Sequence, residues 1–371
     1  IGVRLVGSEM CIRDSYRDAV YMLAIGGEWS EALKYANLGL DIKGFKFKGD
    51  LAYLKARSLE YQLRFLPSAQ AYLDMGRKYK RHSRSETALN KSVILAKAEN
   101  NLTLAAAANI QLAKKSKTNK SRFRYYANVS DLYYQLGKNQ ESLKYGKLAL
   151  KFSSSRDQNL SQRLSNAKNR FALGSQESAL KEFRKLSLDA QKFRDRIDYK
   201  TYQDIRGESN FILAEELRER FIDFRVAEQK RHWKYHLKDK VKLFERVFSN
   251  YSTAISSRHP EWSSKSRFRL GQAAETFSYE INEALMNDEK MAPNEREDIH
   301  KHAIRFKKLA KKLYSENIME RNRSPKTFRN NPWIKKSKIK LSGYHHKDLL
   351  NIDDDRLPYS INSTMPSQWS M

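Results

Sequence analysis

Small and bulky residues recur along the first half of the chain at a spacing of about 37 residues. Five candidate turn residues are separated by 37, 36, 37 and 37 positions: Gly27, Arg64, Asn100, Gly137 and Gly174. A small residue stands five positions after each of them, at Ala32, Ala69, Ala105, Ser142 and Ala179. Because a small residue lets the second helix of a pair approach the first closely, this pattern predicts five helix–turn–helix units over residues 16–190.

Three further columns follow the same spacing. Twelve positions after the turn the residues are mostly small: Gly39, Gly76, Leu112, Ala149 and Leu186. Eleven positions before it they are bulky in four units, at Tyr16, Tyr53, Leu89 and Tyr126, whereas the fifth unit has Arg163. Seven positions before it stand Val20, Arg57, Val93, Ser130 and Ala167, where Arg57 is a misfit. The alternative is a generic helical bundle with chance periodicity.

After Ala190 this spacing stops, and residues 191–257 are predicted to form a long charged helical segment. Apolar residues at helical spacing, from Phe211 to Phe224 and again from Leu237 to Tyr251, predict two long helices or one bent helix.

A C-terminal helical module is predicted over residues 258–342. Pro260-Glu-Trp262 marks a helix start, and the insertion around Asn287–Pro293 separates this helix from a second one over about Glu295–Tyr314. A last helix is expected to open within Asn330–Ile334. The polar and proline-containing residues 343–371 predict a disordered tail.

The repeat columns resemble the tetratricopeptide repeat, whose unit has 34 residues and small residues at equivalent places. The best matching stretches are 130–150 and 26–36, and the extra residues of this chain's longer period are assigned to loops. The last 165 residues or so resemble the tetratricopeptide envelope proteins of bacterial adventurous gliding motility, through Pro260-Glu-Trp262, Arg267-Phe-Arg-Leu-Gly271, Phe277 and Pro332-Trp333. That second resemblance implies a scaffold in a multiprotein machine of the periplasm or cell envelope.

The first residues have a different origin. Leu5–Ser15 contain Glu-Met-Cys-Ile-Arg-Asp, which the end sequence of a transposon-based sequencing adapter encodes in one reading frame. We therefore interpret residues 1–15 as an adapter artefact and expect native residues upstream of Tyr16, where a signal peptide or further repeats could stand. The only cysteine, Cys11, lies in this segment, so we expect no disulfide, cysteine catalysis or cysteine-ligated zinc.

Composition agrees with a helical protein. The chain has 371 residues with only 14 glycines and 7 prolines, and no proline lies between Pro67 and Pro260. This composition disfavours collagen, a disulfide scaffold and a β-sandwich, and no stretch approaches the roughly 18–20 apolar residues of a transmembrane helix. The 71 basic and 43 acidic residues give a net charge of +28.

No catalytic chemistry is evident in the sequence. A phosphate loop, a dinucleotide fingerprint and a nucleophile elbow are all missing. His300 and His302 would point about 200° apart on a helix, and His232 and His236 have only Glu228 as a carboxylate in helical register beside them. We therefore predict a protein that is not an enzyme and that has no cofactor and no metal.

The tetratricopeptide resemblance implies a groove lined by the first helix of each unit and suited to a peptide or helix of a partner protein. Ten residues are candidates for this groove: Ser58, Tyr61, Gln62, Lys97, Arg124, Asp131, Tyr134, Gln135, Lys168 and Phe171. The alternative is a basic helical-repeat protein that binds nucleic acid or another polyanion, such as an anionic envelope polymer or an acidic partner. Its candidate clusters span residues 78–84, 114–120, 230–242 and 335–340.

Overall fold

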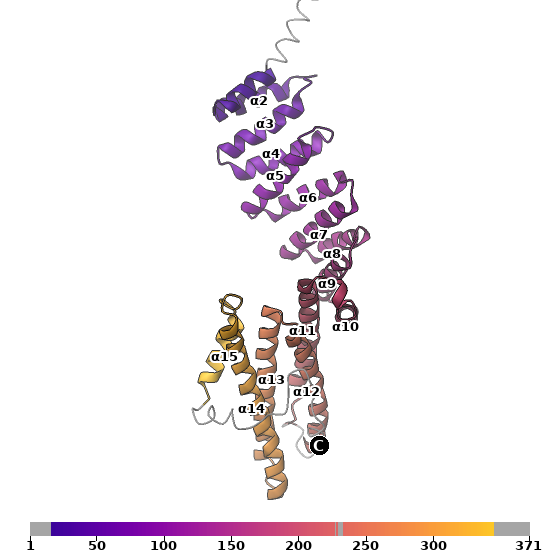
Figure 1. Cartoon of the computed structure of the whole chain (residues 1–371), viewed down its shortest axis with the longest axis vertical. Coiled ribbons are helices and arrows are strands. Elements are labelled where there is room, and N and C mark those ends of the chain that lie inside the picture. The colour runs from indigo at the N-terminus through magenta and orange to yellow at the C-terminus, as the bar shows by residue number, and fades with distance from the viewer. Residues whose placement is uncertain (1–15, 227, 229–232, 345–371) are drawn as a thin grey trace, which may run out of the picture. The chain divides into compact units, whose positions relative to one another are not determined.

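The computed structural model describes residues 16–226, 228 and 233–344, and every regular element within these ranges is helical. The predicted all-α class is confirmed. By its internal contacts the chain divides into two compact units, Ile1–Ser178 and Ala179–Met371, coloured indigo to magenta and magenta to yellow in Figure 1. The adapter-like residues 1–15 and almost all of the predicted tail lie outside the described residues.

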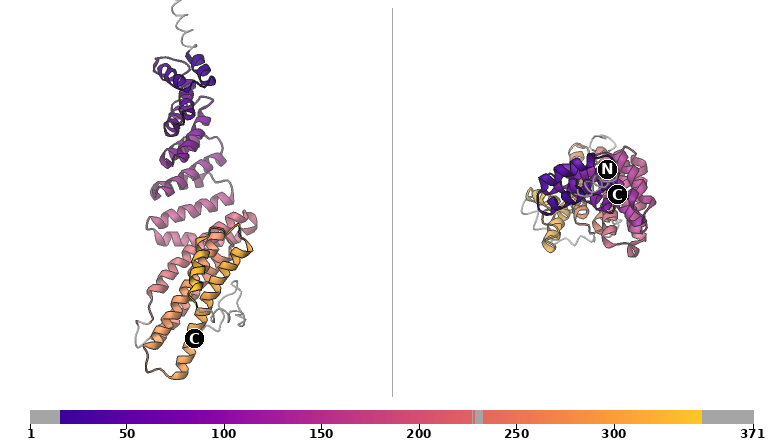
Figure 2. Two further views of the ribbon diagram at one scale, coloured as in Figure 1. Left: turned by 90° about the vertical axis from the view of Figure 1, so that its left-hand side faces the viewer. Right: turned by 90° about the horizontal axis from the view of Figure 1, so that it is seen from above.

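The first unit is a helical solenoid. It begins with helical residues 16–25 and continues with eight helices, each of which packs against the next, as Figures 1 and 2 show. These are α2 (Trp29–Asp41), α3 (Lys48–Tyr61), α4 (Phe65–Lys78), α5 (Ser85–Ala98), α6 (Leu102–Lys115), α7 (Asn119–Gln135), α8 (Asn139–Lys151) and α9 (Arg156–Ala172). The next helix, α10 (Gln176–Lys192), starts in this unit and continues into the second.

Each turn inside a repeat carries one residue in the left-handed backbone conformation. Four of them are at the predicted positions, with φ of 81° at Gly27, 54° at Asn100, 70° at Gly137 and 82° at Gly174. In all five turns the next residue's N–H donates to the carbonyl five positions earlier, as Lys138 donates to Tyr133 over 2.9 Å. This bond closes a helix end in the Schellman manner.

The prediction for the second turn is wrong by one residue. Leu63, with φ of 59°, holds the left-handed position, and Arg64 follows it and donates to the carbonyl of Leu59 over 2.9 Å. The true spacings are therefore 36, 37, 37 and 37 residues. In this register Ala56 takes the place of the misfit Arg57 and Ser68 that of Ala69, whereas Ala52 and Met75 replace Tyr53 and Gly76 in the other two columns.

The small residues allow two helices of a repeat to touch and to exchange hydrogen bonds. Ser142 Oγ donates to the Ser130 carbonyl over 2.7 Å, and Ser68 Oγ donates to the Ala56 carbonyl over 2.8 Å. Ser68, not Ala69, is thus the equivalent of Ser142, although both are fully buried. The remaining predicted small residues, Ala32, Ala105, Ser142 and Ala179, are fully buried as well.

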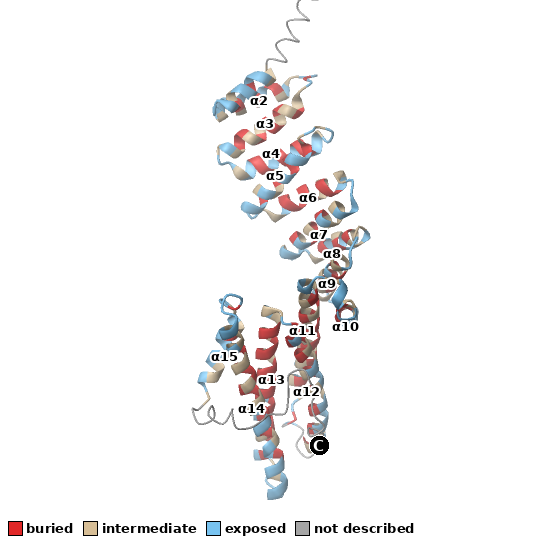
Figure 3. Ribbon diagram, viewed as in Figure 1, coloured by how far each residue is buried: buried red, intermediate tan, exposed pale blue. Residues whose placement is uncertain are grey.

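The second unit consists of longer helices. After α10 and a 3-10 turn, η1 (Arg194–Arg196), come α11 (Tyr199–Asp223), α12 (Trp233–Ser256), α13 (Pro260–Met286), α14 (Pro293–Arg323) and α15 (Pro332–Ser342). Of the two alternatives that the sequence left open, two long helices or one bent helix, the structure shows two separate helices, α11 and α12. Buried residues run along α13, which contacts α11, α12, α14 and α15 (Figure 3).

Two predicted helix starts are confirmed by their caps. His259 Nδ1 accepts from the N–H of Glu261 and of Trp262, and Pro260 occupies the first turn of α13. Asn331 Oδ1 accepts from the Trp333 N–H at the start of α15. The helix predicted over Glu295–Tyr314 is longer than expected, because α14 continues to Arg323.

The continuation of α14 has a packing reason. Asn317, which is fully buried, donates to the Ser264 carbonyl on α13 over 2.9 Å and to Ser337 Oγ on α15 over 3.0 Å. The polar residue that interrupts the apolar pattern in the sequence therefore joins three helices.

We expect Leu63→Gly to raise the free energy of unfolding by up to about 1 kcal/mol. Glycine removes the left-handed steric cost of about 1–2 kcal/mol, although it adds roughly 0.5–1 kcal/mol of entropy to the unfolded chain. The Leu63 side chain is 74% exposed, so its removal loses little burial. Chemical denaturation followed by circular dichroism measures the change.

Ile94→Gly is the matched control. Ile94 is 66% exposed but lies inside α5, where glycine costs about 0.5–1 kcal/mol. Equal destabilisation by the two variants would show that the backbone at Leu63 carries no steric cost.

Candidate functional site

The first helices of the repeats in the first unit present one surface in register. The corrected turn positions place two columns on it, six and three residues before each left-handed residue, and residues three apart share a helix face. We call these ten residues the first-helix face: Tyr21, Ala24, Arg57, Glu60, Ile94, Lys97, Asp131, Tyr134, Lys168 and Phe171.

Asp131 on α7 lies at the centre of the charged part of this face. Lys97 from α5 and Lys168 from α9 flank it, and both act electrostatically on its carboxylate. The desolvation of the carboxylate raises its pKa above the ordinary value, and the two lysines only partly oppose this. The ammonium of Lys168 also lies 5.4 Å from the centre of the Tyr134 ring. The structure therefore brings four of the predicted groove residues together.

A second cluster forms around Tyr61, the last residue of α3. Its ring stacks on Trp29 of α2 with centroids 4.1 Å apart and planes only 4° from parallel. The Arg57 guanidinium lies 5.4 Å from the Tyr61 ring centre and 5.9 Å from that of Trp29. Its hydrogen bond to the Tyr61 hydroxyl is the main cause that raises the pKa of Arg57. Tyr61 stays 51% exposed, so part of its ring is accessible to a partner.

Two predicted groove residues do not belong to the exposed face. Ser58 is fully buried, and Gln62 is half-buried with its Nε2 enclosed by protein. Both errors follow from the one-residue shift at Leu63, since the equivalent positions are Arg57 and Tyr61; the same shift puts Glu60 at the place predicted for Tyr61. Glu60 accepts hydrogen bonds from Lys91 over 2.6 Å and from the Tyr72 hydroxyl over 2.7 Å.

The other predicted groove residues are placed around the two columns. Arg124 is exposed two turns before Asp131 on α7 and lies 4.8 Å from the Tyr125 ring centre. Gln135 is exposed at the end of the same helix, whereas Lys168 and Phe171 are half-buried on α9. Arg57, Glu60, Trp29 and the exposed Ile94 were not among the residues predicted from the sequence. Arg57, Glu60 and Ile94 lie six or three positions before a turn residue once Leu63 is taken as the second turn, whereas Trp29 follows no such spacing.

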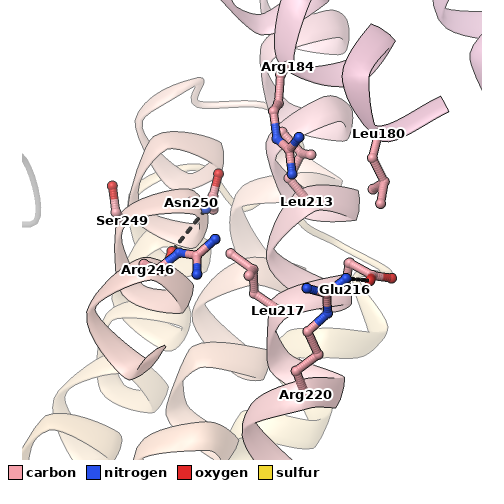
Figure 4. A pocket seen from close by; sticks show the side chains of 9 residues that line it. All are labelled: Leu180, Arg184, Leu213, Glu216, Leu217, Arg220, Arg246, Ser249 and Asn250. Atoms are coloured by element: carbon pink, nitrogen blue, oxygen red, sulfur yellow. Dashed lines mark hydrogen bonds and ion pairs between the residues drawn. The ribbon is translucent and has the colours of Figure 1, made fainter. Parts of the chain in front are cut away.

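A small pocket lies in the second unit between α10, α11 and α12 (Figure 4). It has a volume of about 200 Å³, and Arg184, Arg220 and Arg246 line it. Figure 4 shows the Arg220 guanidinium beside Glu216, and the two groups form an ion pair at 2.6 Å. Because Arg220 is already paired with Glu216 and the volume is small, this pocket is a weak candidate for a ligand site.

Two kinds of feature are missing from the described residues. None of the helices within them is long and apolar enough to cross a bilayer. Nor does the described part of the chain gather three or more histidine, cysteine, aspartate or glutamate side chains in a way that could hold a metal ion.

The chain matches no family model, and no curated protein matches it either. Solved structures do match. "MamA MSR-1 C2" is 18% identical, with 47% of this chain and 94% of that chain covered and a TM-score of 0.27. A tetratricopeptide repeat protein from Parabacteroides merdae ATCC 43184 is 11% identical, with coverage of 79% and 98% and a TM-score of 0.33. A Rap protein complexed with competence and sporulation factor is 10% identical, with coverage of 92% and 99% and a TM-score of 0.33. At these scores the likenesses add nothing to the argument about function.

We expect Asp131→Asn to make the protein more stable at pH 7. A carboxyl whose pKa is raised on folding contributes stability below its unfolded pKa of 3.8, and this contribution is lost as the pH rises through the folded value. Asparagine does not ionise and avoids that loss. The advantage of the variant should therefore shrink as the pH falls from 7 towards 4, in denaturation midpoints measured across that range.

The opposite result, in which Asp131→Asn is the less stable protein at pH 7, would mean that the flanking lysines outweigh the desolvation of the carboxylate.

Proposed function

We propose that this chain is a scaffold without enzymatic activity that binds a peptide or helix of another protein along the first-helix face and the adjoining stack of Trp29 and Tyr61. The observation that carries this proposal is the alternation of exposed apolar groups and charged groups on successive first helices. Ile94 is 66% exposed and Tyr134 40% exposed, and charged residues of both signs stand beside them. Large exposed rings give contact area at a low entropic cost, which suits them as interface anchors.

The position of Asp131 supports this proposal. Asp131 is exposed on this face, with Lys97 and Lys168 near its carboxylate. A basic side chain or backbone amides of a partner can donate hydrogen bonds to this carboxylate.

We further propose that the protein works in a bacterial cell envelope, within a complex such as a gliding-motility machine. This rests on the resemblance of the C-terminal module. Its motif residues are integral to the second unit: Gly271 lies against the Tyr314 ring, and the ring centres of Phe268 and Trp333 are 5.6 Å apart.

Binding of nucleic acid or another polyanion is the second candidate function. Two of the basic clusters adjoin in the first unit, because Lys115 Nζ donates to the Lys80 carbonyl over 3.1 Å. An acidic partner or an anionic envelope polymer could use the same lysines.

The test for the first-helix face selects peptides from a displayed random library on the full-length chain. We expect the selected peptides to bind Tyr61→Ala and Tyr134→Ala at least tenfold more weakly, about 1.4 kcal/mol, because aromatic anchors dominate such interfaces. Tyr279→Ala is the control, since this tyrosine is 62% exposed on α13 of the second unit. Peptides that bind the two groove variants as tightly as the native chain would refute the proposal.

The polyanion candidate is tested by fluorescence anisotropy with a DNA strand of about 20 nucleotides. It predicts affinity that falls steeply with salt, weakens in Lys80→Glu and Lys115→Glu, and stays unchanged in Tyr134→Ala. If Lys80→Glu and Lys115→Glu bind the DNA strand as tightly as the native chain does, the polyanion candidate is refuted.

The envelope proposal is tested on the coding DNA upstream of Tyr16. A basic stretch, an apolar core and a small-residue cleavage site would support export. A start codon after a few polar residues would refute it.

A further inference from the structure

A large cavity in the second unit carries an excess of positive charge. Its volume is about 810 Å³, and η1, α11, the end of α12, the first half of α13 and the end of α14 surround it. Glu320 is the one carboxylate among the sixteen residues that line it, against five arginines: Arg194, Arg206, Arg258, Arg267 and Arg323. Arginines at an ordinary surface have carboxylate partners nearby, so this imbalance points to an anionic ligand.

Arg267 is the innermost of these arginines, with only 8% of its surface exposed. Its Nη2 donates to Glu320 at the long distance of 3.5 Å, and Nε lies 3.8 Å from Glu316. Within the described part of the chain, its Nη1 has no hydrogen-bond partner. A buried guanidinium with an unused donor is costly unless something else accepts from it.

Neighbouring groups increase the positive potential. Burial lowers the pKa of Arg267, and the nearby carboxylates of Glu320 and Glu316 only partly oppose this. Burial also raises the pKa of Glu316 and so disfavours its charged form. The first turn of α13 lines the cavity through Pro260 and Ser263. The N-terminus of a helix of 27 residues adds a partial positive charge there.

The cavity also offers an aromatic surface. Tyr199 and Tyr202 on α11 stack with ring centres 6.2 Å apart and planes 18° from parallel. The Arg194 guanidinium lies 5.4 Å from the centre of the Tyr202 ring. Tyr199 remains 54% exposed, so its ring can stack on a planar group of a ligand.

We propose that this cavity binds a phosphate ester that carries an aromatic ring, with the size and chemistry of a nucleotide. The phosphates contact the guanidinium groups of Arg258, Arg267 and Arg323, because guanidinium groups match phosphate geometry through paired donors. The ring stacks on Tyr199. The volume falls in the range of roughly 300–1,000 Å³ that is usual for small-molecule sites. Ligand binding here is independent of the first-helix face.

Isothermal titration calorimetry of the full-length chain with ATP tests the proposal, with inorganic tripolyphosphate and adenosine as the partial ligands. We expect ATP to bind most tightly, tripolyphosphate to bind at least threefold more weakly, and adenosine to give no measurable heat. Arg258→Ala/Arg323→Ala should weaken ATP binding at least tenfold, and both side chains are exposed, so the variant should fold. Tyr199→Ala should weaken ATP but leave tripolyphosphate unchanged.

Arg184→Ala/Arg246→Ala is the matched control, because it removes two exposed arginines from the smaller pocket of the same unit. The absence of heat with both ATP and tripolyphosphate at about 1 mM would overturn the proposal. An equal loss of affinity in the control would also overturn it and indicate a diffuse charge effect. Tripolyphosphate that binds as tightly as ATP, together with no effect of Tyr199→Ala, would overturn the role of the ring. Tyr134→Ala should leave ATP binding unchanged, so the proposals for the cavity and for the first-helix face are tested independently.

Discussion

The first unit depends on one backbone constraint, the left-handed residue that ends the first helix of every repeat. The N–H of the following residue closes the helix end, as Ser175 does by donating to the Arg170 carbonyl over 3.0 Å. The chain then reverses, and the small residue five positions after the turn brings the second helix into contact. A one-residue change in the turn position would rotate the whole first helix by about 100° relative to its neighbours. The register of the exposed face is therefore set at the turns.

That constraint explains why the first-helix face can act as one surface. Side chains six and three positions before each turn come from segments 36 or 37 residues apart, yet the charges of Lys97 and Lys168 both act on the carboxylate of Asp131. No single helix supplies this arrangement of charge. Ile94 and Tyr134 on this face and Tyr61 beside it are exposed, with charged residues between them, and their order along the repeats gives the surface a direction.

The sequence predicted the helical class, the repeat and most of its register, because glycine and asparagine mark left-handed positions with their own conformational preferences. It failed at Leu63, whose residue type argues against that conformation; the bond from Arg64 to Leu59 and the contact of Ser68 with Ala56 outweigh the local preference. The buried Ser58 and the half-buried Gln62 were predicted to be exposed for the same reason. The arginine cavity was beyond sequence analysis, because its residues come from five separate segments and share no spacing.

The second unit contains a buried charge, Lys240, whose partners all come from the protein. Lys240, fully buried, donates to the Phe224 carbonyl over 2.6 Å and to Glu280, and its ammonium lies 4.6 Å from the Phe221 ring centre. Glu280 in turn accepts from the Val226 N–H. Every strong partner that such a pair needs is present. Arg267 in the same unit has only long contacts to carboxylates and an unused donor. The same unit therefore contains one buried cation whose partners are complete, Lys240, and one, Arg267, whose Nη1 has no hydrogen-bond partner within the described residues and is free to donate to the proposed ligand.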